Sequence, residues 1–371
     1  MKHISCLIKP ASSLCNMRCT YCFYFDVSSH REVETFGRMT QETTERMIDQ
    51  IFIDLNDGDK LTLAFQGGEP TLVGLKYYLH LIDYVDNQPK KIDVSYAIQT
   101  NGLLINKKWC ELFKENNFLV GLSIDGYKEL HDEMRLSSKK GGTFDRIMKS
   151  KALLDEYEIP YNILTVLTKS LAEHPKEIYD FITNEQIEYI QFIPCLDELG
   201  KPCYTSYALE PEEFNSFYQE LFKLWLNDLE KGIYRSFKLF DDIFNLFLKG
   251  QVTACGILGN CQIQYVIEAN GNVYPCDFYC LDDYCLGNIK EHSLKELFNT
   301  DIAFQFTCQK EKSPAYCQKC PFKKGCGGGC RRMKDAIYVN KEETFCGYQS
   351  LLNTMLPDRQ KVVTYLGDLV S

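Results

Sequence analysis

The stretch Cys15-Asn16-Met17-Arg18-Cys19-Thr20-Tyr21-Cys22 decides how the rest of the chain is interpreted. It spaces three cysteines as C-x₃-C-x₂-C, shortly after an apolar run, Ile4–Ile8, that is typical of a buried strand. Three thiolates at this spacing can hold three irons of a [4Fe–4S] cluster and leave the fourth iron open to a small molecule with amino and carboxylate groups. A three-cysteine zinc site completed by a distant residue is the alternative.

Cysteine usage supports ligation of metal or clusters. The chain of 371 residues has 18 cysteines, with three between Cys15 and Cys22 and eleven between Cys255 and Cys346. Met1–Pro10 lacks the apolar stretch of a secretion signal, and the cytosol keeps thiols reduced, so a disulfide framework is not expected. The sequence therefore predicts a cytoplasmic protein whose clustered cysteines bind metal.

Charge and hydropathy argue against two kinds of partner. The net charge is −10, from 41 basic and 51 acidic residues, which disfavours a nucleic-acid backbone as the main partner. No apolar run reaches the roughly 18 residues that a membrane-spanning helix needs, so no membrane partner is expected. Hydrophobic residues make up 45% of the chain, an ordinary value for a globular protein with a core.

Short β-like runs alternate with helix-like segments from residue 4 to about 195. Such alternation predicts an α/β fold with a parallel sheet, and six units fit a partial (β/α)₆ barrel with its chemistry at the carboxyl ends of the strands. The expected strands are Ile4–Ile8, Leu61–Gln66, Val94–Gln99, Leu119–Ile124, Tyr161–Val166 and Tyr189–Ile193. The expected helices are Thr40–Leu55 with Thr40 as N-cap, Leu75–Val85, Lys107–Glu115, Phe144–Tyr157 and Pro175–Thr183.

We expect three domains along the chain. Residues 1–207 form the barrel, residues 208–250 a helical connector, and residues 251–371 a cysteine-dense module that ends in a helix and needs metal to hold it together. Aromatic stripes in the connector, such as Phe214 and Phe217, are interpreted as packing rather than as a cofactor site. In the cysteine-dense module, Asn270-Gly271 predicts a hairpin with a type I′ turn.

A second motif, Gln66-Gly67-Gly68-Glu69-Pro70, follows the second expected strand. The glycines allow the backbone to approach a ligand closely, and backbone carbonyls with Glu69 can receive a charged amino group. An ordinary strand-to-helix turn would use the same residue types.

Eight further cysteines have ligand-like spacing. They suit two zinc sites of four cysteines as well as two clusters, and spacing alone does not separate these. They form the patterns Cys255-x₅-Cys261-x₁₄-Cys276 and Cys317-x₂-Cys320-x₅-Cys326-x₃-Cys330-x₁₅-Cys346.

These motifs together resemble the radical S-adenosylmethionine (SAM) superfamily with its C-terminal SPASM extension. The resemblance implies that Cys15, Cys19 and Cys22 hold the cluster that binds SAM. Residues implied to contact SAM are Tyr21, Gly67, Gly68, Glu69, Ser123 and Arg135, although Tyr21 would also suit loop packing and Arg135 a solvated face.

The SPASM resemblance also assigns the later cysteines. It implies one auxiliary cluster on Cys255, Cys261, Cys276 and Cys330, and another on Cys317, Cys320, Cys326 and Cys346, which makes three [4Fe–4S] clusters in all. Because no iron of either auxiliary cluster would be left open, the resemblance implies that these clusters transfer electrons or support the structure and do not bind the substrate directly. The other cysteines are interpreted as small buried hydrophobic residues: Cys6, Cys110, Cys195, Cys203, Cys280, Cys285 and Cys308.

Within this class the sequence is most similar to the anaerobic sulfatase-maturating enzymes, which convert a Cys or Ser of a sulfatase to formylglycine without oxygen. The resemblance implies that Asp277 accepts a proton, that the peptide enters near Tyr24 and Gln66, and that a ferredoxin or flavodoxin supplies electrons. The expected substrate carries Cys/Ser-x-Pro/Ala-x-Arg. Considered without the resemblance, Asp277 is expected to cap a turn or to form a hydrogen bond with the backbone beside Cys276. The residues that carry the similarity are Leu7–Ser13, Cys22–Tyr24, Ala64–Thr71, Gln99–Gly102 and Tyr274–Tyr279.

Two other functions remain open at this stage. A SPASM maturase of a ribosomally made peptide would use the same architecture to form thioether or carbon–carbon crosslinks, because one scaffold hosts many chemistries. It often has an N-terminal peptide-recognition domain, for which a first strand starting at residue 4 leaves no room. A non-catalytic zinc or cluster protein is the second alternative, but it has no use for the Gly67-Gly68-Glu69-Pro70 loop.

Overall fold

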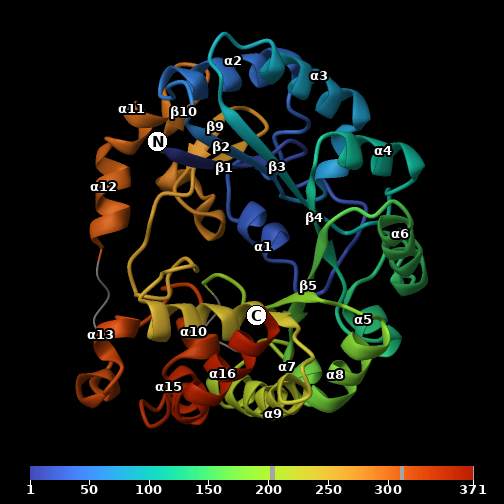
Figure 1. Ribbon diagram of the computed structural model, residues 1–371. Helices are drawn as coiled ribbons and strands as arrows, with labels where there is room; N and C mark the ends of the chain where they lie inside the picture. The colour runs from blue at the N-terminus through green and yellow to red at the C-terminus, as the bar shows by residue number, and fades with distance from the viewer. Residues whose placement is uncertain (201–204, 310–312, 371) are drawn as a thin grey trace. The chain divides into compact units, whose positions relative to one another are not determined.

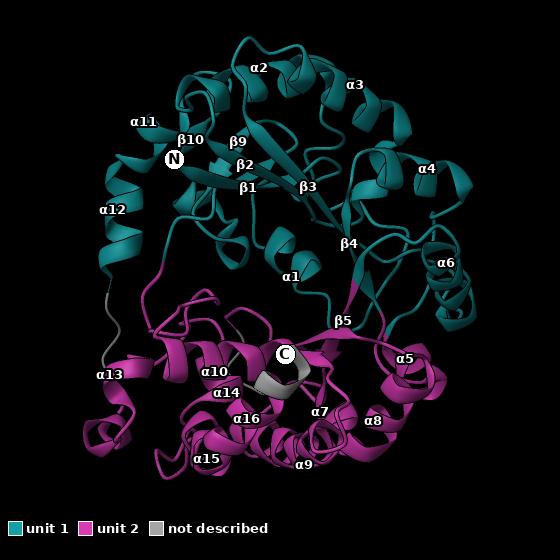
Figure 2. Ribbon diagram, viewed as in Figure 1, with its two compact units in different colours: residues 1–123, 135–161, 262–309 teal, residues 124–134, 162–261, 310–371 magenta. Residues whose placement is uncertain are grey.

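A computed structural model describes residues 1–200, 205–309 and 313–370 (Figure 1). The chain divides into two compact units, each assembled from separate stretches (Figure 2). Unit 1 consists of Met1–Ser123, Arg135–Tyr161 and Gln262–Gln309, and unit 2 of Ile124–Met134, Asn162–Cys261 and Lys310–Ser371. This grouping by contact interleaves the sequence, and the three-domain division by sequence stays a prediction.

Unit 1 is built on a sheet with the strand order β10-β9-β8-β1-β2-β3-β4. Neighbours from β8 to β4 run parallel, whereas β9 is antiparallel to β8 and to β10. Apolar residues such as Ile8 and Phe65 sit opposite each other in the register and are fully buried. The strands are β1 (His3–Lys9), β2 (Lys60–Phe65), β3 (Asp93–Thr100), β4 (Leu119–Ser123), β8 (Val266–Glu268), β9 (Asn272–Tyr274) and β10 (Gly287–Asn288).

Helices α2, α3, α4 and α6 of unit 1 lie along the outer side of the parallel strands, whereas α1 lies toward the middle of the view (Figure 1). Helix α2 shows the local cause: the Thr40 side chain caps its N-terminus by accepting from Thr43 N, and Met47, Ile48 and Ile51 form its buried face. The helices are α1 (Phe23–Ser29), α2 (Gln41–Ile53), η1 (Pro70–Val73), α3 (Leu75–Asp86), α4 (Lys107–Glu115), α6 (Phe144–Glu156), η2 (Asp277–Tyr279), η3 (Asp282–Tyr284), α11 (Leu294–Phe298) and α12 (Asp301–Cys308).

Unit 2 combines parallel strands with helices. Its β6 (Tyr189–Pro194) pairs with β5 (Tyr161–Leu167) and β7 (Ser236–Phe237). In α9 (Pro211–Leu229), Phe217 packs 5.0 Å from the Phe192 ring of β6, so the aromatic stripe is core packing, as predicted. The other helices are α5 (Lys128–Met134), α7 (Lys169–Ala172), α8 (Pro175–Asn184), α10 (Lys238–Lys249), η4 (Ala315–Lys319), α13 (Lys323–Cys326), α14 (Lys334–Ile337), α15 (Gly347–Met355), η5 (Leu356–Asp358) and α16 (Arg359–Val370).

Three details differ from the sequence predictions. The prediction of a type I′ turn is wrong. β8 ends at Glu268, and the carbonyl of Glu268 accepts a hydrogen bond from Gly271 N at 2.8 Å. Gly271 has φ +92°, whereas Asn270 is not among the described residues with positive φ. This is a three-residue loop that ends in a glycine bulge. Cys308 is exposed and Cys285 half-buried, so neither is a buried hydrophobic residue, and Cys203 lies outside the described residues.

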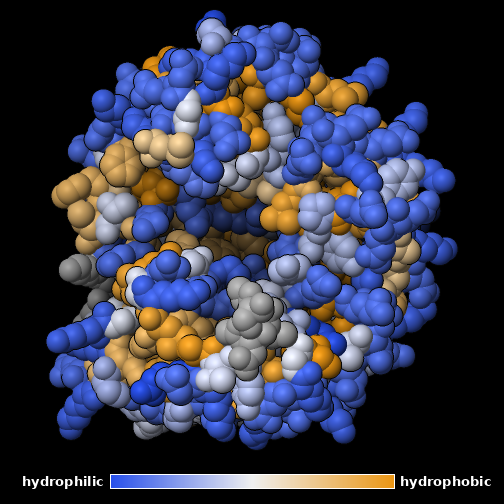
Figure 3. Space-filling view, in the orientation of Figure 1, coloured by the Kyte–Doolittle hydropathy of each residue, from blue (hydrophilic) through white to orange (hydrophobic). Residues whose placement is uncertain are grey.

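Hydrophilic side chains dominate the surface over α2 and α3 (Figure 3). Phe298 on α11 and Phe304 on α12 are exposed apolar side chains. Among the described helices, none has the length and apolar character needed to cross a membrane.

Candidate active site

The loop that leaves β1 carries the three cysteines of the first motif, and Cys22 is the N-cap of α1. Their thiols are half-buried. Burial raises the pKa of Cys15 to about 11; Met17 N–H and the Arg135 charge act in the opposite direction, while Cys22 and Glu69 raise it further. Burial also raises the pKa of Cys22, so these two thiols are protonated without metal and cluster binding must displace their protons. Three soft thiol donors on one loop, with the Arg135 charge acting on Cys15 and Cys22, fit an anionic cluster with one open iron.

The glycine-rich loop after β2 packs directly on this cysteine loop. Gly68 N donates to Ser12 O at 2.9 Å and Glu69 N to Leu14 O at 2.8 Å. Gly67 has φ +124°, and a Cβ at Gly68 would lie 2.2 Å from Leu14 O. Both positions need glycine because the backbones touch, so the two motifs that the sequence pairs are one structural element.

Glu69 is fully buried, and donors surround its carboxylate. Oε1 accepts from Thr71 N at 3.0 Å and from Thr100 Oγ1 at 2.7 Å, and Oε2 accepts from Asn101 N at 2.8 Å. Burial raises the pKa of Glu69 and these bonds oppose the rise. Glu69 thus ties the loop to the carboxyl end of β3, a role that the sequence analysis did not predict. Its contact with SAM stays a prediction.

The predicted ribose and carboxylate contacts lie at the carboxyl end of β4 and after it. Ser123 Oγ accepts from Gln99 Nε2 at 2.9 Å, and Arg135 Nη1 donates to Tyr21 Oη at 2.7 Å. Arg135 is only 7% exposed, so the solvated-face interpretation is wrong. Gln99 is a polar neighbour that the sequence analysis did not single out, although it begins the quoted Gln99–Gly102 stretch.

Asp277 lies in η2 with Tyr24 and Gln66 at its carboxylate. Oδ2 accepts from Tyr24 Oη at 2.6 Å and from Gln66 Nε2 at 3.3 Å, and Tyr24 also contacts Gln66. Burial, followed by the Asp277 charge, raises the pKa of Tyr24 well above its usual value, so Tyr24 stays a proton donor. The structure thus joins all three residues that the sequence assigned to the substrate and to the proton transfer. Lys9, which no sequence pattern singles out as a site residue, places its ammonium 2.8 Å from Asp277 Oδ1.

Four cysteines of unit 2 line one cavity, together with aromatic side chains such as Tyr316 and Tyr338. Burial raises the pKa of Cys326 to about 11 and of Cys346 to about 12. Across the described residues, no three His, Cys, Asp or Glu side chains converge closely enough to share one metal ion. Four soft donors around a mostly apolar cavity fit an iron–sulfur cluster. The four are Cys317, Cys320, Cys326 and Cys346.

The other auxiliary ligand set is divided between the units. Cys255, Cys261 and Cys330 belong to unit 2, where a Cβ at Gly256 would lie 2.8 Å from the Cys330 Cβ, so the turn after Cys255 packs on Cys330. Cys276 belongs to unit 1. This ligand set therefore stays a prediction.

Replacing Cys346 by Ser is expected to remove one cluster. Because Cys346 is one of four thiols on the cavity, its loss opens that site, and the iron bound after anaerobic reconstitution should fall by about one third if three equal clusters are present. Iron analysis checks this, with the buried Cys110→Ser as the control. Equal iron in both variants would show that Cys346 is not a ligand.

Comparison with known proteins agrees with this geometry. Residues 10–182 match the family profile of the radical SAM superfamily, and residues 255–321 match that of an iron–sulfur cluster-binding domain, SPASM. The chain is 42% identical to a cysteine-type anaerobic sulfatase-maturating enzyme of Clostridium novyi (strain NT), over 93% of both chains. It is 28% identical to a serine-type enzyme of Bacteroides thetaiotaomicron, over 89% of this chain and 83% of that one.

Solved structures give the same result. The chain superposes on native anSMEcpe with bound AdoMet and Kp18Cys peptide with a TM-score of 0.89, at 36% identity, over 98% of this chain and 99% of that one.

Fold, motifs and cavity together define a radical SAM enzyme with a C-terminal cluster-binding SPASM domain. It uses SAM with a [4Fe–4S] cluster, and the SPASM domain binds further iron–sulfur clusters. Within this class the chain belongs to the family of anaerobic sulfatase-maturating enzymes. The predicted fold class, enzyme class and family are confirmed.

Proposed function

We propose that this protein oxidises a cysteine side chain of a sulfatase to formylglycine under anaerobic conditions. The observation that carries the proposal is the Asp277 carboxylate, held by Tyr24 and Gln66 in the same unit as the cysteine and glycine-rich loops. The greater identity to a cysteine-type than to a serine-type relative favours cysteine as the target. The reaction removes two electrons from the substrate and releases its sulfur, and water supplies the aldehyde oxygen.

Residues of this chain bind the cofactor and shield it from water. Bound SAM and its cluster supply a radical able to take hydrogen from the substrate Cβ. We propose that Gly67, Gly68 and Glu69 position the methionine moiety, while Ser123 and Arg135 contact the ribose and carboxylate. Tyr21 would support this arrangement through its hydrogen bond with Arg135. Packing of the two loops against each other would hold the cofactor in a fixed position relative to the cysteines, and such fixed positioning of reactants accelerates a reaction.

Asp277 takes the proton of the substrate thiol. Its Oδ2 already accepts two hydrogen bonds, so this oxygen is the one aimed at polar hydrogens in the site. A thiol that displaces the long bond from Gln66, at 3.3 Å, would donate to the same oxygen. Tyr24, which remains protonated, then orients the carboxylate and lines the path of the peptide.

Partners and remaining cofactors follow from the same proposal. The substrate is a sulfatase segment with Cys-x-Pro/Ala-x-Arg, and a ferredoxin- or flavodoxin-type protein donates electrons. The eight SPASM cysteines would hold two auxiliary clusters, giving three [4Fe–4S] clusters, and carry the second electron away. The need for reduced thiols favours work in the cytoplasm.

The experiment is an anaerobic assay of two peptides that differ only in Cys or Ser at the target position. Reconstituted enzyme, dithionite and SAM are present, and mass spectrometry follows conversion to the aldehyde while chromatography follows 5′-deoxyadenosine. Aldehyde from the Cys peptide is the expected result. Aldehyde from the Ser peptide alone would move the enzyme to the serine type. Formation of 5′-deoxyadenosine with both peptides unchanged would reject the proposal and favour peptide crosslinking.

A further inference from the structure

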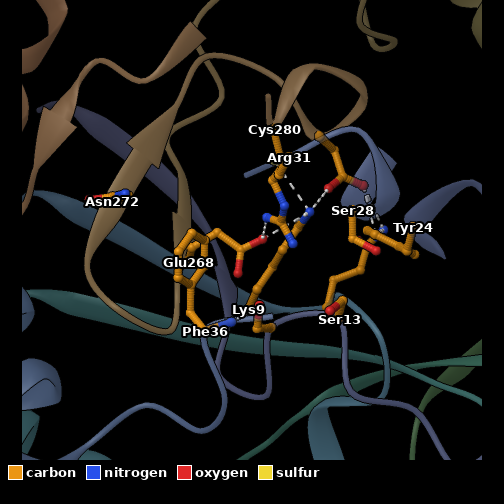
Figure 4. Close-up of polar contacts among 12 residues, drawn as sticks. Lys9, Ser13, Tyr24, Ser28, Arg31, Phe36, Glu268, Asn272 and Cys280 are labelled. Atoms are coloured by element: carbon orange, nitrogen blue, oxygen red, sulfur yellow. Dashed lines mark hydrogen bonds and ion pairs between the residues drawn. The ribbon is translucent and has the colours of Figure 1, made fainter. Parts of the chain in front are cut away.

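Four buried charged side chains form a line of alternating sign that ends at Asp277. Arg31 Nη1 lies 2.7 Å from Glu268 Oε1, Lys9 Nζ lies 3.9 Å from the same oxygen, and Lys9 Nζ lies 2.8 Å from Asp277 Oδ1. Figure 4 shows Arg31 and Lys9 reaching Glu268 from two directions. The residues are between 1% and 8% exposed, so water screens none of these charges well.

Strand pairing places the central pair of this line. Lys9 is the last residue of β1 and Glu268 the last of β8, and the two are direct partners in the parallel register. Arg31 follows α1, and Asp277 follows β9 in the same hairpin segment as Glu268. The β1–β8 pairing therefore brings the ammonium of Lys9 to the carboxylate of Asp277.

Lys9 has the surroundings of a permanent cation. Its ammonium also lies 3.3 Å from Cys280 Sγ and 4.6 Å from the centre of the Tyr24 ring. Burial lowers the pKa of Lys9, but the negative charges of Asp277 and Glu268 outweigh it, and the net direction is upward. Burial raises the pKa of Cys280 to about 12, so that neighbour is a neutral thiol.

The two oxygens of the Asp277 carboxylate contact different partners. Oδ1 faces Lys9, whereas Oδ2 faces Tyr24 and Gln66. Lys9 Nζ lies 2.8 Å from Oδ1, so an ion pair between two buried groups holds this oxygen. A partial turn of the carboxylate would move Oδ2 away from Tyr24 and Gln66, and the contacts with Tyr24 on one side and Lys9 on the other oppose it.

We propose that Lys9 is a positioning residue that holds Asp277 Oδ1 so that Oδ2 faces the substrate, and that it thereby sets the share of SAM cleavage events that end in aldehyde. The proposal rests on the proposed function. Without the cation at Oδ1, only Tyr24 and Gln66 at Oδ2 hold the carboxylate, and Glu268 becomes a second buried anion nearby without its Lys9 partner. SAM would still be cleaved, but in many cleavage events Asp277 would not take the thiol proton and no aldehyde would form.

A purely structural role for Lys9 makes a different prediction. If the line of charges only joins β8 to β1, its loss would lower iron content, SAM cleavage and aldehyde formation together. A positioning role lowers the aldehyde formed per 5′-deoxyadenosine, a ratio that partial unfolding does not change.

The test compares Lys9→Met, Lys9→Gln and Lys9→Arg with wild type and with Lys151→Met as reconstituted enzymes. Lys151 is the matched control, because it is also buried and paired, 3.1 Å from Asp155. We expect the aldehyde formed per 5′-deoxyadenosine to fall by about tenfold or more in Lys9→Met, to recover in part in Lys9→Gln and Lys9→Arg, and to stay at the wild-type value in Lys151→Met.

Each outcome decides one point. A wild-type ratio in Lys9→Met, or a parallel fall of iron, cleavage and aldehyde in every Lys9 variant, would overturn the positioning role. If only Lys9→Met fails to bind iron, the aldehyde formed per 5′-deoxyadenosine in Lys9→Gln and Lys9→Arg is compared with wild type instead, since both side chains still reach toward Oδ1. Absence of aldehyde from the wild type rejects the proposed function and this inference with it; wild-type aldehyde with unchanged ratios rejects the inference alone.

Discussion

Gly68→Ala is expected to lose SAM cleavage by about 100-fold or more, because small misplacements in a reactive geometry have effects of that size. The added Cβ would lie 2.2 Å from Leu14 O and 2.7 Å from the carbonyl carbons of Leu14 and Ser13. These are backbone atoms, so no side chain can turn away, and the loop that carries Cys15 must move. The measurement is 5′-deoxyadenosine formed with dithionite and SAM, alongside bound iron.

Gly141→Ala is the control for this change. Its Cβ would meet only Ser137 Oγ at 3.6 Å, an ordinary contact, and Gly141 does not have a positive φ. Cleavage should therefore stay near the wild-type rate. If Gly68→Ala also cleaved SAM at the wild-type rate with normal iron, the packing of the glycine-rich loop on the cysteine loop would have no role in catalysis.

Asp277→Asn is expected to lower aldehyde formation by about 100-fold or more while most SAM cleavage continues. An amide cannot take the thiol proton, and its Nδ2 would face either Lys9 or the donors Tyr24 and Gln66. The loss should therefore exceed that of any Lys9 variant, since the carboxylate itself is removed. Parallel assays of aldehyde and 5′-deoxyadenosine measure both effects on one sample.

Asp283→Asn serves as the matched change, because Asp283 is an exposed carboxylate on η3, a few residues further along the chain. It should retain wild-type yields of both products. Full aldehyde yield from Asp277→Asn would remove Asp277 from the proton transfer and leave Tyr24 and Lys9 as the groups to examine.

Strand and helix positions could be predicted well because their signal is local. Every expected strand is present with ends that differ by at most one residue, and α4 has the predicted bounds, Lys107–Glu115. Burial alternates along these strands, as in His3–Lys9, and this pattern is carried by neighbouring residues. The sequence predicts the hairpin correctly but not its turn type, because the number of loop residues depends on where β8 stops pairing.

Motif residues of the site could also be found from the sequence, whereas their partners could not. The cysteine motif and the glycine-rich motif each follow a predicted strand and can be recognised from their residues, but the contact between Gly68 and the cysteine loop is seen only in the structure. Lys9 pairs with Cys280 across 271 positions and Arg31 with Glu268 across 237, distances at which periodicity carries no information. The sequence alone does not decide whether Arg135 binds SAM or lies on a solvated face, because burial of a single arginine depends on the whole fold.

The most direct test of the account follows the hydrogen that leaves the substrate. A Cys-x-Pro-x-Arg peptide carrying deuterium at the cysteine Cβ is incubated anaerobically with reconstituted enzyme, dithionite and SAM, and mass spectrometry measures deuterium in 5′-deoxyadenosine together with aldehyde in the peptide. The account predicts deuterated 5′-deoxyadenosine and aldehyde in equal amounts. Deuterium transfer without aldehyde, or aldehyde without deuterium transfer, would contradict it.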